Sequence, residues 1–219
     1  MPDITRRGFI LTAAAASSAI LLGSALTGCG STGANGPGTA KRLTVAASPT
    51  PHAKILSEFA APKLKDQGIE LTVKEYTDYI IPNQVTSSGE VDANYFQHIN
   101  YLDNYNEKNG TDLVGVAAIH YEPFGIYAGT SSDLLSIADG AQIAVPNDPT
   151  NEGRALLLLQ QEKIIRLSNP NDLEATATSV ADNPHNVRLV EVEAAAVPRQ
   201  LQDVNFAVIN GNYAIEAGM

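Results

Sequence analysis

An arginine near the start of a predicted helix is the residue best suited to bind an anion. An apolar run ends at Pro146, Asp148 is a good N-cap, and Pro149 fits the first helical position. Arg154 lies in the second turn of this helix, and helical side chains lean toward the N-terminus. Its guanidinium can therefore reach the first turn, where unpaired backbone N–H groups favour negative charge. The chemistry that this pattern predicts is the capture of a carboxylate.

Other interpretations of this arginine remain open. Arg154 can instead be solvated on the helix surface or paired there with Glu152 or Glu162. Gly153, which precedes it, costs the helix about 1 kcal/mol relative to alanine and indicates that something approaches the backbone closely. A ligand and a neighbouring strand would each account for that glycine.

A cluster of aromatic residues surrounds His98. Nine of the thirteen aromatic residues of the chain lie between Tyr76 and Tyr127. The segment 95–98 follows a predicted strand, at the position where open α/β sheets place their ligands. Aromatic rings there would suit an apolar or thioether side chain, since sulfur–ring contacts contribute about 0.3–1.5 kcal/mol each. The alternative is a locally aromatic core. The cluster consists of Tyr79, Tyr95, Phe96, Tyr101 and Tyr105.

Other polar residues favour binding over catalysis. Asn210 ends an apolar strand, where its amide oxygen can accept a hydrogen bond from an ammonium group, although it can equally begin a turn or helix. His52, His120 and His185 are isolated in the sequence and show no metal-ligand spacing, which argues against a zinc or iron site. The chain contains no G-x-S-x-G motif or P-loop, and its acids form no recognisable pair. We therefore expect neither a catalytic residue nor a metal or other cofactor.

The N-terminus predicts export. Arg6 and Arg7 precede a stretch without charged residues from Gly8 to Ala40, and Arg-Arg-Gly-Phe-Ile is similar to a twin-arginine signal, with an ordinary charged n-region as the alternative. Leu26–Cys29 resembles the bacterial lipobox, in which the cysteine is lipidated and becomes the first residue of the mature protein. We therefore expect a signal peptide over residues 1–28.

A lipidated Cys29 and a flexible tether would follow this signal. Residues 29–40 lack any periodic pattern and have a root-mean-square reach of ~18 Å as a coil. Cys29 is the only cysteine, which excludes disulfide bonds. The formal charge of −10 argues against nucleic-acid binding. The protein is thus expected on the outer face of the cell membrane, held by its lipid.

From Lys41 onward, short apolar runs alternate with helical patterns, which is typical of an α/β fold with mainly parallel strands. We expect a first lobe over residues 41–121, a hinge crossing at 122–129, a second lobe over 130–205, and a return crossing at 206–219. Strands are expected at residues 43–47, 69–73, 91–95, 113–119, 143–145, 188–192 and 206–209, and helices at 53–65, 78–87, 99–108, from 149 onward and at 172–181.

Several strings between Leu43 and Gly218, taken together and in order, resemble the NlpA family, the methionine-binding lipoproteins of bacterial ABC importers. The combination is far more specific than any one string. The resemblance implies a two-lobed, periplasmic-binding-protein-like fold, type II-like, with mainly parallel sheets and flanking helices. Such a protein closes on L-methionine or a close relative and delivers it to a membrane permease driven by an ATPase. The matching strings are Tyr79–Asn83, Asp92–His98, Tyr101–Asp103, Ala144–Asn151, Gly153–Gln160 and Ala207–Asn210.

The resemblance also implies residue roles. Arg154 matches the family arginine that binds the ligand carboxylate, and Asn210 matches the asparagine at the amino-acid head group. Nothing in this set requires a cofactor. The positions that match the side-chain pocket are Phe96, His98 and Tyr101, with Tyr79 and Asn147 as further candidates.

The chain departs from the family pattern at its end. Family members continue beyond the segment that matches Val208–Met219 and return to complete the first lobe. We therefore expect a C-terminally truncated chain whose first lobe is incomplete and exposes apolar surface. The alternative functions are a binding lipoprotein for another apolar amino acid or a methionine-containing dipeptide, and a surface lipoprotein without a transport role.

Overall fold

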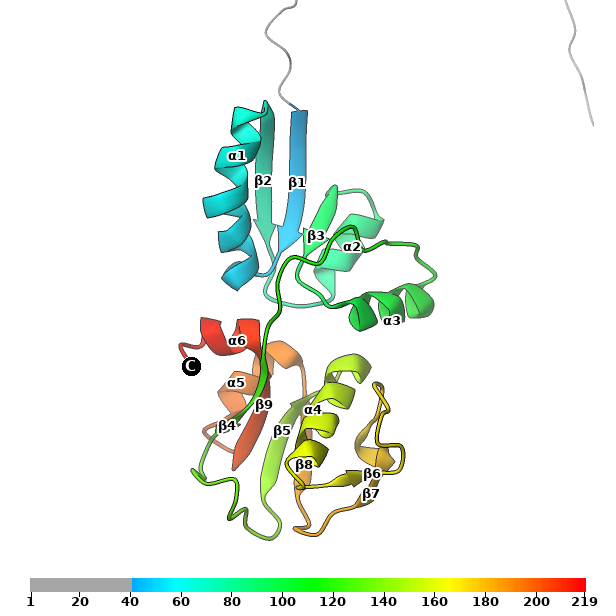
Figure 1. Ribbon diagram of the computed structural model, residues 1–219, viewed down its shortest axis with the longest axis vertical. Coiled ribbons are helices and arrows are strands. Elements are labelled where there is room, and N and C mark those ends of the chain that lie inside the picture. The colour runs from blue at the N-terminus through cyan, green and yellow to red at the C-terminus, as the bar shows by residue number, and fades with distance from the viewer. Residues whose placement is uncertain (1–40) are drawn as a thin grey trace, which may run out of the picture. The chain divides into compact units, whose positions relative to one another are not determined.

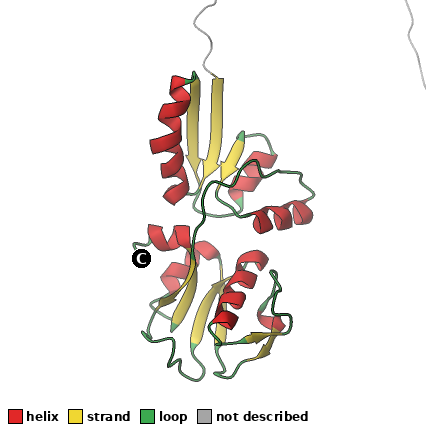
Figure 2. Ribbon diagram, in the orientation of Figure 1, coloured by secondary structure: helices red, strands yellow, loops and turns green. Residues whose placement is uncertain are grey.

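The computed structural model describes residues 41–219, so the predicted signal peptide, Cys29 and the tether lie outside the described residues. Its strands form a sheet of order β2-β1-β3, a sheet of order β4-β9-β5-β8, and a ribbon of β6 and β7 (Figures 1 and 2). The strands are β1 (Lys41–Ala47), β2 (Ile69–Glu75), β3 (Ala93–Tyr95), β4 (Phe124–Ala128), β5 (Gln142–Pro146), β6 (Arg166–Leu167), β7 (Val180–Asp182), β8 (Arg188–Val192) and β9 (Phe206–Asn210). The helices are η1 (Pro49–Ala53), η2 (Ile55–Ala60), α1 (Ala61–Asp66), α2 (Ile81–Ser87), α3 (Ile99–Asn109), α4 (Pro149–Gln161), η3 (Ala177–Ser179), η4 (Ala194–Ala196), α5 (Val197–Gln200) and α6 (Gly211–Glu216).

The first sheet is parallel throughout, as the alternation of apolar runs and helical patterns predicted. In the register of β1, Lys41 lies opposite Ile69 of β2, and Val45 lies opposite Ala93 of β3. The helical stretch of η2 and α1 packs on β2. Burial in this sheet is concentrated at the carboxyl end of β1, whereas α1 contains no buried residue.

Large apolar side chains remain exposed in the part of the chain that includes this sheet. The two clusters of buried apolar residues in the described chain lie around the second sheet instead. Large apolar side chains are also exposed elsewhere, among them Leu135 and Leu173, so the expectation of an incomplete first lobe stays a prediction. In the part that includes the first sheet, the exposed residues are Phe59, Ile80, Ile81, Ile99, Val114, Val116, Ile119 and Tyr121.

The second sheet holds the larger core. β9, β5 and β8 are parallel, and only β4 runs antiparallel to its neighbour β9. Successive residues of a strand face opposite sides of the sheet. Ile143 and Val145 of β5 therefore pack in the cluster that contains Leu156 and Leu159 of α4, whereas Ala144 packs in the cluster of the opposite face. Figure 1 shows α4 on one face of this sheet and α5 and α6 on the other.

The predicted hinge and return segments contain two paired strands. β4 falls within residues 122–129 and β9 within 206–219, and Phe124 lies opposite Asn210 in their antiparallel register. α6 follows β9 and packs against η1. The lobe boundaries themselves stay a prediction.

Two predicted elements are wrong. Residues 113–119 form no strand, because no strand of the described chain pairs with them, and Val114, Val116 and Ile119 stay exposed. Residues 172–181 form no long helix. The side chain of Asp172 accepts from a backbone N–H two residues later, and Thr176 and Ser179 cap one another, so local hydrogen bonds compete with the helix there.

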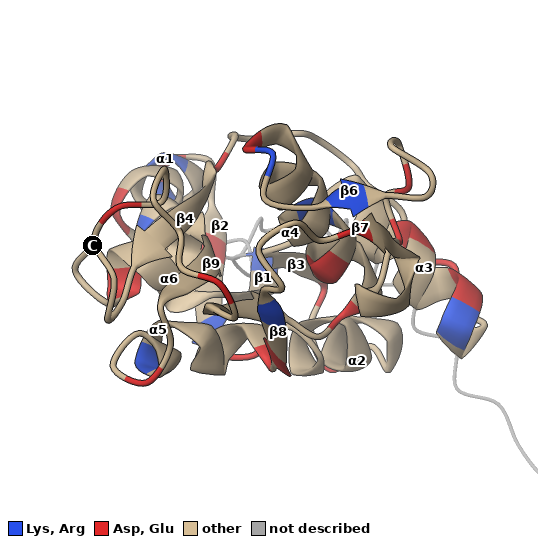
Figure 3. Ribbon diagram, turned by 90° about the horizontal axis from the view of Figure 1, so that it is seen from below, with Lys and Arg blue, Asp and Glu red and all other residues tan. Residues whose placement is uncertain are grey.

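The surface of the described residues carries charges of both signs. Acidic and basic residues are interspersed over helices and loops in the view of Figure 3. Among the described helices, none combines the length and the apolar character needed to cross a bilayer.

Candidate ligand-binding site

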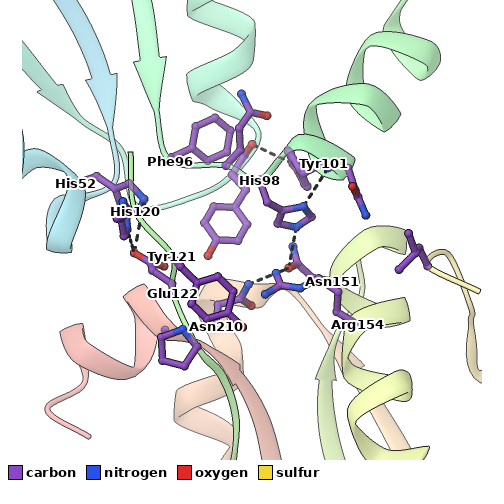
Figure 4. Close-up of a pocket in the computed structure, with 16 residues that line it drawn as sticks. His52, Phe96, His98, Tyr101, His120, Tyr121, Glu122, Asn151, Arg154 and Asn210 are labelled. Atoms are coloured by element: carbon purple, nitrogen blue, oxygen red, sulfur yellow. Dashed lines mark hydrogen bonds and ion pairs between the residues drawn. The ribbon is translucent and has the colours of Figure 1, made fainter. Parts of the chain in front are cut away.

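A cavity of about 390 Å³ lies where strands of both sheets end (Figure 4). The segments that follow β1, β3 and β9, together with the first turns of α4 after β5, supply side chains to it. Parallel strands present their carboxyl ends at one edge of a sheet, which is where open α/β folds place ligands. The lining residues are His52, Tyr79, Phe96, Gln97, His98, Asn100, Tyr101, His120, Tyr121, Glu122, Pro123, Asn151, Arg154, Leu173, Asn210 and Gly211.

The structure brings six of the seven predicted binding residues to this cavity and leaves one outside. Asn147 does not line it. Its side chain is exposed where the chain turns from β5 into α4, and its backbone N–H donates to the Val192 carbonyl at 2.9 Å. The six that line the cavity are Arg154, Asn210, Phe96, His98, Tyr101 and Tyr79.

The start of α4 holds Arg154 as the sequence predicted. Asp148 is the N-cap, its carboxylate accepts from the Asn151 backbone N–H at 3.0 Å, and Pro149 occupies the first turn. The Arg154 guanidinium lies 4.6 Å above the centroid of the Phe124 ring and donates from Nη1 to Asn151 Oδ1 at 2.8 Å. Burial lowers the pKa of this arginine below its ordinary value, which still leaves it charged at neutral pH.

Neither acid considered as a partner pairs with Arg154. Glu152 is buried and accepts from the Ala177 backbone N–H at 2.8 Å, and burial, followed by the neighbouring Glu191 carboxyl group, raises its pKa to about 7. Glu162 lies at the opposite end of α4. The ion pairs among the described residues do not include Arg154. A half-buried guanidinium without a protein anion is a strong site for a ligand carboxylate, because charge-assisted hydrogen bonds are the stronger class.

Asn151 is the centre of the polar network and was not predicted as a site residue. Its Oδ1 accepts from Arg154 and, at 2.9 Å, from Asn210 Nδ2, and it lies 3.4 Å from His98 Nε2. Its Nδ2 donates to both carboxylate oxygens of Asp148 at 3.0 Å. The spacing contained a usable signal, because residues 148, 151 and 154 are three apart and lie on one helix face.

Asn210 presents an unused acceptor. The residue is 7% exposed, and its Oδ1 has no hydrogen-bond partner among the described residues. It occupies the N-cap position of α6, but its side chain makes no capping hydrogen bond. A buried acceptor without a partner costs about 1–3 kcal/mol, and a ligand ammonium group would supply the missing donor.

His98 is held as a neutral donor. It is the N-cap of α3, and its Nδ1 accepts from the Tyr101 backbone N–H at 3.2 Å. The proton of the neutral ring therefore belongs on Nε2, which faces Asn151. Burial, followed by the nearby Arg154, lowers the pKa of His98, so the imidazole stays uncharged at neutral pH.

Three aromatic rings form the apolar side of the cavity. The ring centroids are 5.8 Å apart for Tyr79 and Phe96, 6.0 Å for Tyr79 and Tyr101, and 5.9 Å for Phe96 and Tyr101. The Tyr101 hydroxyl donates to the Tyr79 carbonyl at 2.9 Å, which fixes one ring against the chain that carries another. Tyr95 and Tyr105, from the same sequence cluster, do not line the cavity.

His52 and His120, which are isolated in the sequence, lie together in the structure. Nitrogen atoms of these two residues and a carboxylate oxygen of Glu122 all lie within 4.8 Å of one another at the cavity. Burial, followed by the nearby His120, lowers the pKa of His52 to about 4. Sequence spacing could not reveal this group, because residue 52 follows β1 and the other two precede β4.

Comparisons with known proteins agree on one family. A family model described as NlpA lipoprotein matches residues 43–219. Membrane lipoprotein TpN32 of Treponema pallidum (strain Nichols) is 43% identical over 169 residues, which cover 77% of this chain and 63% of the relative. D-methionine-binding lipoprotein MetQ of Escherichia coli (strain K12) is 41% identical over 167 residues, or 75% of this chain and 62% of the relative. The chain thus spans less than two thirds of the length of these curated relatives.

A solved structure supports the same comparison. The structure of a nutrient binding protein from Burkholderia cenocepacia bound to methionine matches with a TM-score of 0.77 and 36% identity. The match covers 81% of this chain and 75% of that chain. The architecture of alternating strands and helices is therefore that of substrate-binding proteins.

Proposed function

This chain belongs to the NlpA lipoprotein family, and from that premise we propose that it binds L-methionine or a close relative and delivers it to an ABC permease and its ATPase. Support comes from the names of its relatives, which include a D-methionine-binding lipoprotein and a nutrient binding protein bound to methionine. The protein acts by binding and release. Its cavity of about 390 Å³ falls within the usual range for small-molecule sites, roughly 300–1,000 Å³.

Each part of an amino-acid ligand has a complementary group in the cavity. Arg154 binds the carboxylate, and Asn210 Oδ1 accepts from the ammonium group. Asn151 holds both residues at hydrogen-bonding distance, so the two ends of the ligand head group are recognised by one connected network. The observation that carries the proposal is this pair: a guanidinium without a carboxylate partner and a buried acceptor without a donor, both within the described residues and lining one cavity.

The aromatic side of the cavity accounts for the preference for methionine. Tyr79, Phe96 and Tyr101 line the cavity with their rings close together, and we infer that they contact the ligand side chain. A thioether gains about 0.3–1.5 kcal/mol from each sulfur–ring contact, an energy that a branched aliphatic side chain of similar size lacks. We therefore expect methionine to bind more tightly than leucine.

The site of action follows from the N-terminal sequence. We propose that Cys29, outside the described residues, is lipidated and holds the binding domain at the outer face of the cell membrane. The family and its relatives are lipoproteins by name, which supports this placement. A tethered binding protein stays within reach of a membrane permease, which raises its effective concentration there.

Binding is tested by calorimetry and thermal denaturation with L-methionine, D-methionine and L-leucine. We expect methionine to raise the melting temperature of the wild type, and Arg154→Ala to lower the affinity by at least about 100-fold, because a charge-assisted contact is lost. Arg188→Ala is the matched control, since Arg188 is an exposed arginine of β8. Its affinity should equal that of the wild type.

Arg154→Lys refines the test. Lysine keeps the charge but loses the planar fork of donors, so its affinity should lie between those of the wild type and Arg154→Ala. Methionine affinity that is unchanged in Arg154→Ala would refute the assigned role of the arginine. Equal affinities for leucine and methionine would replace the proposed ligand by apolar amino acids in general, and no binding of any amino acid would remove the proposed function.

A further inference from the structure

The far end of the cavity holds a group of potential metal ligands that the amino-acid site does not use. His52 lies in η1, directly after β1, whereas His120 and Glu122 lie in the segment that leads from α3 into β4. Figure 4 shows both histidine side chains directed at the Glu122 carboxylate. Glu122 Oε1 is 2.8 Å from His120 Nε2 and 3.6 Å from His52 Nε2.

The geometry of the group fits a tetrahedral ion. Ligand atoms placed about 2.1 Å from a tetrahedral metal lie roughly 3.4 Å from one another. The two measured separations lie on either side of this value, and the three ligand atoms all fall within 4.8 Å of one another. A tetrahedral arrangement would need the ligand atoms to adjust around the ion, with Glu122 and His120 partly exposed and His52 buried. Two imidazoles and a carboxylate are a common zinc-ligand set, and three protein ligands leave a fourth position open.

The ring of His52 is buried and makes no hydrogen bond within the described part of the chain. Its side chain is 4% exposed, and its Nε2 lies 3.6 Å from the Glu122 carboxylate, beyond hydrogen-bond distance. Buried polar side chains are normally satisfied, so an exception requires an explanation. An ion between Nε2 and the carboxylate would supply a partner for Nε2, whereas the buried Nδ1 would keep none among the described residues.

A hydrogen bond through its other ring nitrogen orients His120. His120 Nδ1 forms a hydrogen bond with the Tyr95 hydroxyl, at the end of β3, which leaves Nε2 free to contact Glu122. Metal-binding histidines usually make such a hydrogen bond through their other nitrogen, because it fixes the ring and its tautomer. The two imidazole rings lie 4.9 Å apart at an interplanar angle of 65°, so they do not stack against each other.

We propose that His52, His120 and Glu122 bind a divalent transition-metal ion, with zinc as the expected metal. The ion would link the segment before β4, through His120 and Glu122, to His52 after β1, at the edge of the ligand cavity. This site is independent of the proposed amino-acid binding, because it shares none of Arg154, Asn151 or Asn210. The alternative is a hydrogen-bonded group of two histidines and a glutamate without affinity for metal.

The test uses the full chain without a polyhistidine tag and with Cys29→Ser, which removes the only thiol. After dialysis against a chelator, Zn²⁺ is titrated by calorimetry and Co²⁺ by visible absorption, which reports tetrahedral coordination. We expect one strong site per chain. His120→Gln and Glu122→Gln should each weaken Zn²⁺ binding by at least about 10-fold, since even indirect supporting residues of metal sites contribute that much.

His185→Gln is the matched control, because His185 lies outside the group and outside the cavity. It should bind Zn²⁺ as the parent chain does. Unchanged circular dichroism and an unchanged melting temperature without metal establish that each variant is folded, and Glu122→Gln retains the size of its side chain for this purpose. The proposal is overturned if the parent chain binds Zn²⁺ no more tightly than the double variant His120→Gln/Glu122→Gln, or if neither single variant weakens the binding.

Discussion

At the scale of single residues, the cavity depends on one asparagine as much as on the arginine that the sequence singled out. Asn151 contacts Arg154, Asn210 and the N-cap Asp148 at once. The cap and its proline predicted the position of Arg154, because these are local rules of helix starts. The three-residue spacing could place Asn151 on the same helix face as Arg154, but its bond with Asn210, which is 59 residues away, depends on the tertiary structure.

Asn151→Asp should weaken methionine binding. The new carboxylate would lie at the position that now accepts from Arg154 Nη1 at 2.8 Å, and it would neutralise the guanidinium from within the protein. The ligand carboxylate would then meet an arginine that is already paired, and we expect the dissociation constant to rise by at least about 10-fold.

Calorimetry measures this change, with Asn171→Asp in an exposed loop as the control for added charge. A wild-type affinity in Asn151→Asp would mean that the ligand carboxylate binds elsewhere.

At the scale of elements, the fold follows the predicted helices and strands where they are buried or capped. α4 begins at its predicted cap and packs its apolar face against β5. The predicted strand at 113–119 has high β-propensity, but it finds neither a pairing strand nor a core within the described residues. The sequence left open whether Gly153 of α4 makes room for a ligand or for a neighbouring strand. The structure shows that the backbone of Leu173 approaches the helix there.

Gly153→Ala should destabilise the protein although alanine favours a helix by about 1 kcal/mol. A Cβ at position 153 would lie 2.2 Å from the Leu173 carbonyl oxygen and 3.0 Å from the Glu174 backbone nitrogen, so backbone has to move. We expect a net loss of about 1–3 kcal/mol in the free energy of unfolding, measured by urea denaturation.

Gly115→Ala is its control, because a Cβ there meets only the end of the Ile99 side chain at 3.6 Å. If Gly153→Ala were as stable as the wild type, the backbone at Leu173 would have moved at little cost in free energy.

At the scale of the whole molecule, the two main sheets are joined around the cavity by contacts that need no ligand. The Tyr213 hydroxyl donates to the Thr77 carbonyl at 2.9 Å, and the Tyr79 hydroxyl donates to Asn212 Oδ1. Both donors are tyrosines, and burial raises the pKa of each above its usual value, so they remain protonated donors throughout the physiological range. These hydrogen bonds position the first-sheet residues of the cavity relative to α4 and β9.

Cys29→Ser should release the protein from the membrane fraction. The only proposed membrane attachment is the lipid on this cysteine, and each buried CH₂ of an acyl chain contributes about 0.8 kcal/mol to membrane binding. Cell fractionation followed by immunoblotting measures the change, and Ser31→Ala, two residues along, is the control. If Cys29→Ser stayed with the membrane at wild-type levels, another attachment would have to hold it.

The sequence by itself determined the α/β class, the helix start at Asp148, and the position of Arg154 in the second turn of that helix, because periodicity and capping act over a few residues. Only the tertiary structure decided which polar groups share the cavity. It left Asn147 outside, brought Asn151 to the centre, and assembled His52, His120 and Glu122 from distant segments. The physical reason is that strand pairing and packing set the distances between residues far apart in the chain, and binding chemistry depends on those distances.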